Sequence, residues 1–223
     1  MNRSDYYGQM RKLADEQRSL IGLKGPRVLK SDLRKLFKHH GVQVDLWPMP
    51  GMVTQKSLKN LRGAYMEHPE SGPCVMISRD IPDEPQIFTM AHELKHHLAD
   101  RELITAFCHQ ANTSDVLEIG AEVFAAELIY PQQLFSDNLS SMGVIHGQCT
   151  AREIVKLKHE TQTTLSYAGL AKRAEFLGFA PADSLKNIKW KKLEESIYGE
   201  PVYKQIIRYR RSGGSFKLPT IQT

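Results

Sequence analysis

The residues best suited to chemistry lie in one short stretch, residues 91–98 (AHELKHHL), which contains the pattern His-Glu-x-x-His. The flanking periodicity predicts a helix over 86–99. Residues four apart share a helical face, so His92 and His96 can direct ring nitrogens to a point about 2.0–2.1 Å from each, the length of a zinc–nitrogen bond. Glu93 lies beside that point and can accept a proton from water without being a ligand. The stretch therefore predicts a catalytic metal centre.

Such a five-residue pattern also occurs on polar surface helices, where two histidines and a salt-bridging glutamate need no metal. The neighbouring residues argue against that interpretation, because the predicted helix has an apolar surface beside the histidines, formed by Ile87, Phe88, Met90, Ala91, Leu94 and Leu98. Charged groups in a partly buried site need a partner such as a metal ion.

A catalytic zinc site needs a third protein ligand and an open position. The downstream candidates are Glu102, His109, Glu118, Glu122 and Glu127. Glu102 has the spacing of a metzincin ligand, but the chain lacks the glycine and the histidine of that pattern. His109 lies in a segment with little periodicity.

Glu118 is the favoured third ligand. It opens a predicted amphipathic helix over 114–130, in which alanines keep one face small enough to approach the His-Glu-x-x-His helix. Glu122 lies one turn further on and could receive the N–H of a metal-bound imidazole, which would fix the orientation of the ring. Glu127 does not share this spacing and is expected to be solvated.

These two motifs carry a family resemblance. Residues 88–98 (FTMAHELKHHL) and 118–131 (EIGAEVFAAELIYP), with supporting similarity at 61–65 and 75–78, resemble the ImmA/IrrE family of small metallopeptidases over roughly residues 28–180. Glu122 stands where Asn or Asp is commoner in the family, and the segment beyond 181 has no recognised counterpart.

The resemblance implies a zincin-like fold with a gluzincin-type site that holds one Zn²⁺, although Mn²⁺ stays open as the native metal. It assigns the ligand roles to His92, His96 and Glu118 and the general-base role to Glu93. Family members are typically cytoplasmic, and many cleave a helix-turn-helix transcriptional repressor of a stress response or a mobile genetic element. The resemblance thus predicts a regulatory zinc endopeptidase with such a repressor as its substrate.

The order of predicted elements is typical of an α+β fold, with strands early and helices late. Strand patterns over 42–46, 63–66 and 74–78 predict a small antiparallel three-stranded sheet. A helix over 5–21, capped by Ser4 or Asp5, precedes them, and a helical pair over 151–161 and 166–177 follows the motif helices. We expect an N-terminal helix in 1–27, a metallopeptidase domain over 28–180 and a basic tail over 181–223.

Composition and charge indicate which class of protein this chain belongs to. With 223 residues, 41% of them hydrophobic and 25% charged, the chain is typical of a globular protein and not of a disordered or disulfide-stapled one. Three scattered cysteines, no apolar leader and no membrane-spanning stretch predict a cytoplasmic protein without a membrane partner. Residues 1–40 carry 10 Lys/Arg against 4 Asp/Glu, residues 41–180 carry 11 against 17, and residues 181–223 carry 9 against 4. Any weak contact with nucleic acid is therefore expected at the basic ends.

Two other functions compete with proteolysis. The helical pair has the layout of a DNA-binding helix-turn-helix, with four cations, Lys156, Lys158, Lys172 and Arg173. The tail alternates aromatic and basic residues, as proteins that bind single-stranded nucleic acid often do. Alternatively, zinc could stabilise an interaction module, such as part of a toxin–antitoxin pair, without catalysis.

Two details of a peptidase mechanism stay open in the sequence. Tyr65, Tyr130 and His97 are available to stabilise an oxyanion, and none is preferred. An extended substrate could add to a strand at the edge of the sheet, either Gly63–Met66 or Cys74–Ser78.

Overall fold

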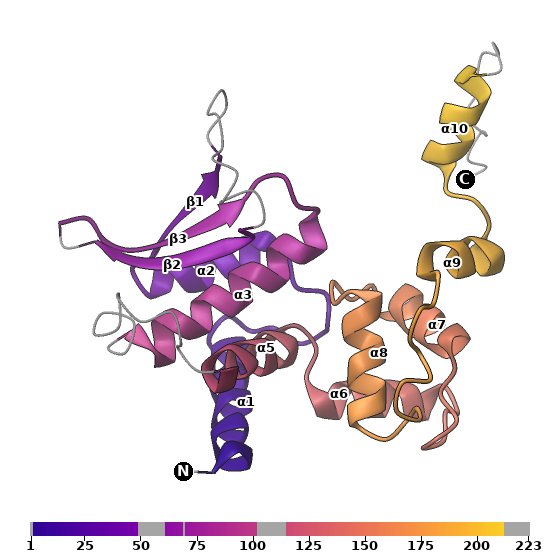
Figure 1. Ribbon diagram of the computed structural model, residues 1–223, viewed down its shortest axis with the longest axis horizontal. Helices are drawn as coiled ribbons and strands as arrows, with labels where there is room; N and C mark the ends of the chain where they lie inside the picture. The colour runs from indigo at the N-terminus through magenta and orange to yellow at the C-terminus, as the bar shows by residue number, and fades with distance from the viewer. Residues whose placement is uncertain (1, 49–60, 69, 102–114, 212–223) are drawn as a thin grey trace.

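A computed structural model describes residues 2–48, 61–68, 70–101 and 115–211 of the chain. Within these ranges two helices precede three strands, and the rest of the ordered chain is helical (Figure 1). The predicted α+β class is confirmed. None of the described helices has the length and apolar character needed to cross a membrane.

The chain begins with helix α1 (Arg3–Leu20). Its cap is Asn2, whose side chain accepts a hydrogen bond from the backbone N–H of Asp5 at 2.9 Å, so the prediction of a cap at Ser4 or Asp5 was wrong. One face of α1 is buried at a helical spacing, through Tyr6, Met10 and Ala14. These side chains belong to the same hydrophobic core as the strands and the motif helices.

Helix α2 (Lys30–His39) follows and covers the sheet. The carboxylate of Asp32 accepts the backbone N–H of Leu29 at 3.0 Å, which satisfies a free donor at the start of the helix. One face of α2 is apolar and buried, through Leu33, Leu36 and Phe37.

The sheet consists of β1 (Gln43–Trp47), β2 (Gly63–His68) and β3 (Gly72–Ser78) in the order β1-β3-β2. β2 and β3 form the expected antiparallel hairpin, but β1 pairs with β3 in parallel. The prediction of an antiparallel sheet was therefore wrong for one of the two pairings. Alternation of polar and apolar residues is the same in both directions, so it reports a half-buried strand and not its partner's orientation.

The two motif helices lie together below the sheet. Helix α3 (Asp83–Ala99) carries the His-Glu-x-x-His pattern and packs against β2, β3 and α2, and α5 (Asp115–Ile129) lies between α3 and α1 (Figure 1). Ala121 and Ala125 are fully buried on α5, as the small face predicted. This layering brings residues 26 positions apart in sequence to one site.

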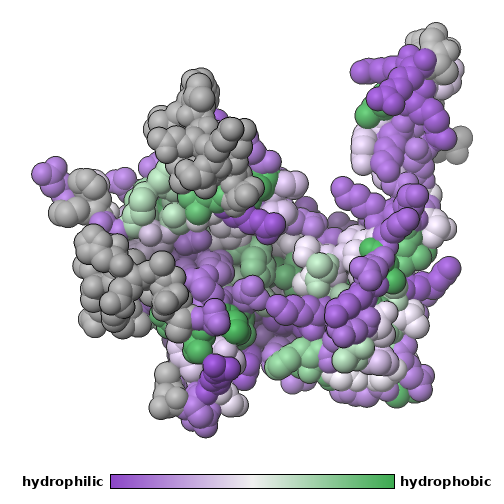
Figure 2. Space-filling model, in the orientation of Figure 1, coloured by the Kyte–Doolittle hydropathy of each residue, from purple (hydrophilic) through white to green (hydrophobic). Residues whose placement is uncertain are grey.

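The C-terminal part is a second cluster of helices, α6 (Gln132–Ser141), α7 (Ala151–Thr161), α8 (Tyr167–Phe176), α9 (Trp190–Tyr198) and α10 (Val202–Arg211). α6 was not predicted: Pro131 ends α5, but its fixed φ also suits the start of a new helix. α7 and α8 match the predicted helical pair. The predicted basic tail contains α9, which packs on α7, and α10, which projects from the molecule with a largely hydrophilic surface (Figures 1 and 2).

Candidate metal centre

Two histidines of α3 and one glutamate of α5 converge at the surface between these helices. Nε2 of His92 lies 3.2 Å from Nε2 of His96 and 3.2 Å from a carboxylate oxygen of Glu118. Nε2 of His96 lies 3.5 Å from the other oxygen of that carboxylate. The structure thus brings together the three predicted ligands, and their ligand atoms all lie within 4.8 Å of one another.

The spacing of these atoms fits a zinc ion. Two ligands bound tetrahedrally at about 2.0–2.1 Å are about 3.3–3.4 Å apart, which is close to the three observed separations. If the Nε2 atoms of His92 and His96 both carry lone pairs, the two neutral rings cannot hydrogen-bond to each other. A cation between them would accept both lone pairs. Two imidazoles and a carboxylate are a donor set that catalytic zinc accepts, with a fourth position open.

Asp100, at the end of α3, determines which nitrogen of His96 is free. One of its carboxylate oxygens lies 2.7 Å from Nδ1 of His96, and the side chain is only 2% exposed. Because a carboxylate can only accept, Nδ1 carries the proton and Nε2 keeps its lone pair toward the metal position. Burial disfavours the charged carboxylate, but hydrogen bonds from His96 and Lys95 outweigh it and lower the pKa of Asp100.

Asp100 was not predicted from the sequence, which instead favoured Glu122 as the acceptor of an imidazole N–H. The carboxylate of Glu122 is instead ion-paired with Lys172 of α8 at 3.0 Å, and among the described residues no hydrogen bond joins it to either histidine. The assignment of Glu122 as the partner of an imidazole N–H was therefore wrong in this geometry. The spacing of four residues from His96 to Asp100 could have identified the correct carboxylate, because it continues the same helical face.

Of the three remaining ligand candidates, Glu127 alone lies among the described residues. Glu127 is not solvated as expected: it is buried, its carboxylate pairs with Arg173 at 3.2 Å, and it accepts the backbone N–H of Gln132 at 2.9 Å. It lies at the other end of α5 from Glu118. Glu102 and His109 lie outside the described residues.

Glu93 is next to His92 in the chain and is almost completely buried, with 8% of its surface exposed. Burial raises its pKa to about 7; the charge of Glu118 acts in the same direction, and His96 and a hydrogen bond with the Tyr65 backbone act against it. A carboxylate with a pKa near neutrality can both accept and return a proton at physiological pH. Such a protonation equilibrium is what a general base requires.

Strand β2 covers Glu93 so closely that one position requires glycine. A Cβ atom added to Gly63 would lie 2.4 Å from Cγ2 of Thr89 and 3.0 Å from a carboxylate oxygen of Glu93. These distances are below van der Waals contact. Gly63 therefore allows the strand to approach the base directly.

The side chains proposed for oxyanion stabilisation have other partners. The hydroxyl of Tyr65 lies 2.5 Å from a Glu67 carboxylate oxygen, to which it donates, and 3.1 Å from Nδ1 of His97. Tyr130 is fully buried, and its hydroxyl accepts a hydrogen bond from Asn138 at 2.7 Å. Tyr130 thus has a packing role, whereas Tyr65 and His97 form a network behind β2.

The cations of the helix-turn-helix candidate are largely used inside the molecule. Lys158 pairs with Glu84 at 2.8 Å and donates to the backbone carbonyls of Thr163 and Leu165. Arg173 is buried against Glu127, and Lys172 is paired with Glu122. Lys158 and Arg173 are therefore held within the molecule, whereas Lys172 forms a surface ion pair in which it is 79% exposed.

Comparison with known proteins points to the same chemistry. The family of peptidases described by an IrrE N-terminal-like domain matches residues 38–168, more than half of the chain. A solved structure of a Mycobacterium tuberculosis transcriptional regulator is similar at a TM-score of 0.50 and 15% identity, over 82% of this chain and 52% of that one. The chain thus spans about half the length of that protein, and the likeness supports the fold alone. A search of curated proteins found no match.

Proposed function

Because the chain belongs to the metallopeptidase family with an IrrE N-terminal-like domain, we propose that it is a zinc-dependent endopeptidase of narrow specificity. Its proposed substrate is a helix-turn-helix repressor of a stress response or a mobile genetic element, in the cytoplasm. The observation that carries the peptidase proposal is the tetrahedral spacing of His92, His96 and Glu118 beside the buried carboxylate of Glu93.

The residues present divide the catalytic tasks between them. Zinc held by His92, His96 and Glu118 would polarise the scissile carbonyl and acidify water. Glu93 takes a proton from the attacking water and returns it to the leaving amine. Asp100 keeps the lone pair of His96 directed at the metal position.

The strand register identifies the edge on which an extended substrate would lie. β3 is paired on both sides, which excludes Cys74–Ser78 and leaves β2 as the candidate next to the site. The hydrogen bond from the Ser78 N–H to the Arg62 carbonyl, at 2.7 Å, makes this a hydrogen-bonded pair of the antiparallel ladder. By alternation the peptide groups of Gly63, Tyr65 and Glu67 face the free edge. Because the backbone of Tyr65 is already hydrogen-bonded to Glu93, we propose that the remaining peptide groups of this edge hold the substrate strand by β-augmentation.

A site that requires an extended segment cuts exposed loops and linkers and spares folded domains. Helix-turn-helix repressors with a linker between domains meet that requirement, and this supports a regulatory role. The fold neighbour, itself titled a transcriptional regulator, is consistent with such a context.

We propose α10 as the site of weak nucleic-acid contact. Two aromatic side chains of the predicted tail are stacked internally, Trp190 on Tyr167 and Tyr198 on His159. Tyr203 on α10 is 57% exposed, on a helix that carries four Lys or Arg residues and no acidic residue. This surface would bind phosphates without sequence specificity.

The test is cleavage of the helix-turn-helix repressor encoded nearest the gene. We expect the purified zinc-loaded protein to cut that repressor at one site in a linker, and the metal-free protein and Glu93→Gln to leave it intact. Zinc content should be about one per chain in both the wild type and Glu93→Gln. Cleavage by Glu93→Gln at the wild-type rate would contradict the assigned base.

The same samples separate the competing functions. If wild type and Glu93→Gln bind one zinc, and neither cuts the repressor nor a library of unstructured peptides, zinc has a structural role in an interaction module. If the wild type binds no transition metal after reconstitution, the peptidase proposal fails.

A further inference from the structure

A lysine lies fully buried within the metal-binding motif itself. Lys95, between Glu93 and His96, is 0% exposed. Its ammonium contacts a carboxylate oxygen of Asp100 at 2.5 Å, and this oxygen is the one that accepts Nδ1–H of His96. Lys95 is thus bonded to the carboxylate that orients one of the ligands.

The same ammonium also reaches the helix that carries the third ligand. It donates to the backbone carbonyl of Leu117 at 3.1 Å, and Leu117 directly precedes Glu118. One buried cation therefore joins the orienting group of His96 on α3 to the backbone beside Glu118 on α5.

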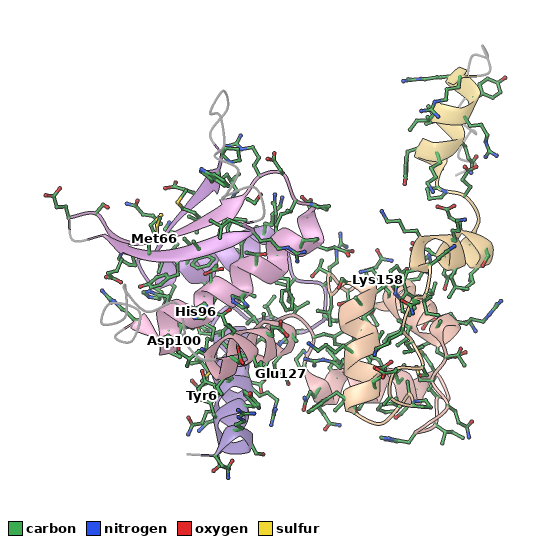
Figure 3. All side chains as sticks on the ribbon, in the orientation of Figure 1. Tyr6, Met66, His96, Asp100, Glu127 and Lys158 are labelled. Atoms are coloured by element: carbon green, nitrogen blue, oxygen red, sulfur yellow. The ribbon has the colours of Figure 1, made fainter. Side chains whose placement is uncertain are left out.

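Helix α1 closes this arrangement from the other side. The ring of Tyr6 lies 5.5 Å from the Lys95 ammonium, in the range of a cation–π contact. A Cβ atom on Gly120 would lie 2.6 Å from the Tyr6 ring, so α1 and α5 meet here at close range. Figure 3 shows Tyr6, Asp100 and His96 near one another where α1, α3 and α5 meet.

We propose that Lys95 is a positioning residue that preorganises the metal site, by holding Asp100 against His96 and fixing the start of α5 at Glu118. The proposal rests on the proposed function, because it requires that the three ligands bind zinc. It is more specific than a role in stability. A buried ion pair contributes little to stability compared with apolar residues of similar volume, whereas groups that orient metal ligands typically change metal affinity 10–100-fold.

The test compares zinc affinity between Lys95→Met and a matched control. Arg173→Met breaks another buried ion pair, Arg173–Glu127, which lies about 13 Å from Glu118 along α5. Zinc affinity is measured by competition with a chelator, and the free energy of unfolding of each metal-free protein is measured by urea titration. We expect Lys95→Met to weaken zinc binding by about 10–100-fold and Arg173→Met to leave it unchanged, although both lose stability.

Two further readouts report ligand geometry and the route of the effect. The visible absorption of bound Co²⁺ should change in Lys95→Met and stay as in the wild type in Arg173→Met. Asp100→Asn should weaken zinc binding by itself, and Lys95→Met should have a smaller effect in the Asp100→Asn background. Should Lys95→Met not fold, Lys95→Gln keeps a donor and most of the volume, and a loss of affinity in the same direction is expected.

The outcomes distinguish this proposal from the proposed function. Wild-type zinc affinity and an unchanged Co²⁺ spectrum in a folded Lys95 variant would overturn the role of Lys95 and leave the metal site in place. Equal losses of affinity in Lys95→Met and Arg173→Met would overturn it as well, by tracing the effect to stability. If the wild type itself fails to bind zinc, the metal site fails first.

Discussion

At the scale of single residues, the site depends on carboxylates whose surroundings give them different roles. Glu93 on α3 and Asp100 at the C-terminal end of α3 are both buried. Asp100 accepts hydrogen bonds from a lysine and a histidine, whereas burial is the main influence on Glu93. The pKa of Asp100 is therefore lowered and that of Glu93 is raised to about 7. A charged Asp100 can orient the ring of His96, and we expect Glu93 to exchange protons.

The raised pKa of Glu93 predicts a pH-dependent cost in stability for the metal-free protein. An unfolded glutamate titrates near 4.3, so between about pH 4 and pH 7 the folded state holds a proton that the unfolded state has released. The wild type thus loses stability over this range as pH rises, and Glu93→Gln does not lose this contribution. The gap between the variant and the wild type should grow by up to about 3 kcal/mol from pH 4 to pH 8. Urea unfolding at both pH values measures it, and a constant gap would show that Glu93 titrates normally.

Gly63 predicts a defect in catalysis that is separate from metal binding. In Gly63→Ala, the new Cβ would displace Thr89 or the Glu93 carboxylate, at a cost of about 1–3 kcal/mol in stability. Cleavage should fall at least tenfold while zinc content stays near one per chain. Gly25→Ala is the control, because its Cβ would meet nothing within 4 Å. Full activity in Gly63→Ala would mean that β2 can move away from the base at little cost.

At the scale of elements, the third ligand depends on how α5 is held between two helices. Glu118 has the correct distance from the histidines only because α5 approaches α3 on its alanine face and α1 through Gly120. α1 lies before the start of the family match at residue 38, yet its buried side chains share the core of the domain. The N-terminal helix is thus part of the support of the site.

Substitutions of Tyr6 test whether α1 supports the metal site. Its hydroxyl is buried, and no hydrogen-bond partner for it occurs among the described residues, so Tyr6→Phe should change stability by less than about 1 kcal/mol. Tyr6→Ala removes the ring over Lys95 and should cost about 3–5 kcal/mol. Thermal unfolding and zinc competition measure both variants. We expect weaker zinc binding only in Tyr6→Ala, and equal zinc affinity in the two would separate α1 from the metal site.

At the scale of the whole molecule, ion pairs join the motif helices to the C-terminal helices, and one of these pairs is buried. Arg173 of α8 pairs with Glu127 of α5, and Lys158 of α7 pairs with Glu84 of α3. The C-terminal end differs, because α10 has no buried residue and extends away from the other helices (Figure 1).

Truncation should distinguish α9 from α10. A chain that ends at Gly199 loses no buried residue of α10 and one ion pair to α9, Lys204–Glu195, so its melting temperature should stay within about 2 °C of the full chain. A chain that ends at Lys189 also loses the stacking of Trp190 on Tyr167 and of Tyr198 on His159, and it should melt several degrees lower. Zinc affinity should be unchanged in both. A large loss of stability on removing α10 alone would show that this helix contributes more to stability than its ion pair with Glu195 of α9.

The local chemistry of the site was determined by the sequence. Helical spacing alone places His92 and His96 on one face with Glu93 beside them, and the small face of α5 with Glu118 at its start predicted the third ligand. These features depend on neighbours within one or two turns, where the geometry of the helix is fixed. The same spacing would have led to Asp100, four residues after His96, had it been followed one turn further.

Only the tertiary structure decided which groups meet across elements. The parallel pairing of β1 with β3, the ion pairs that occupy Glu122 and Glu127, and the contact of Gly63 with Glu93 all join residues distant in the chain. The sequence around a polar helical residue can be the same whether that residue faces solvent or a buried partner. Its role depends on which other elements pack against it, and the local periodicity of the sequence does not contain that information.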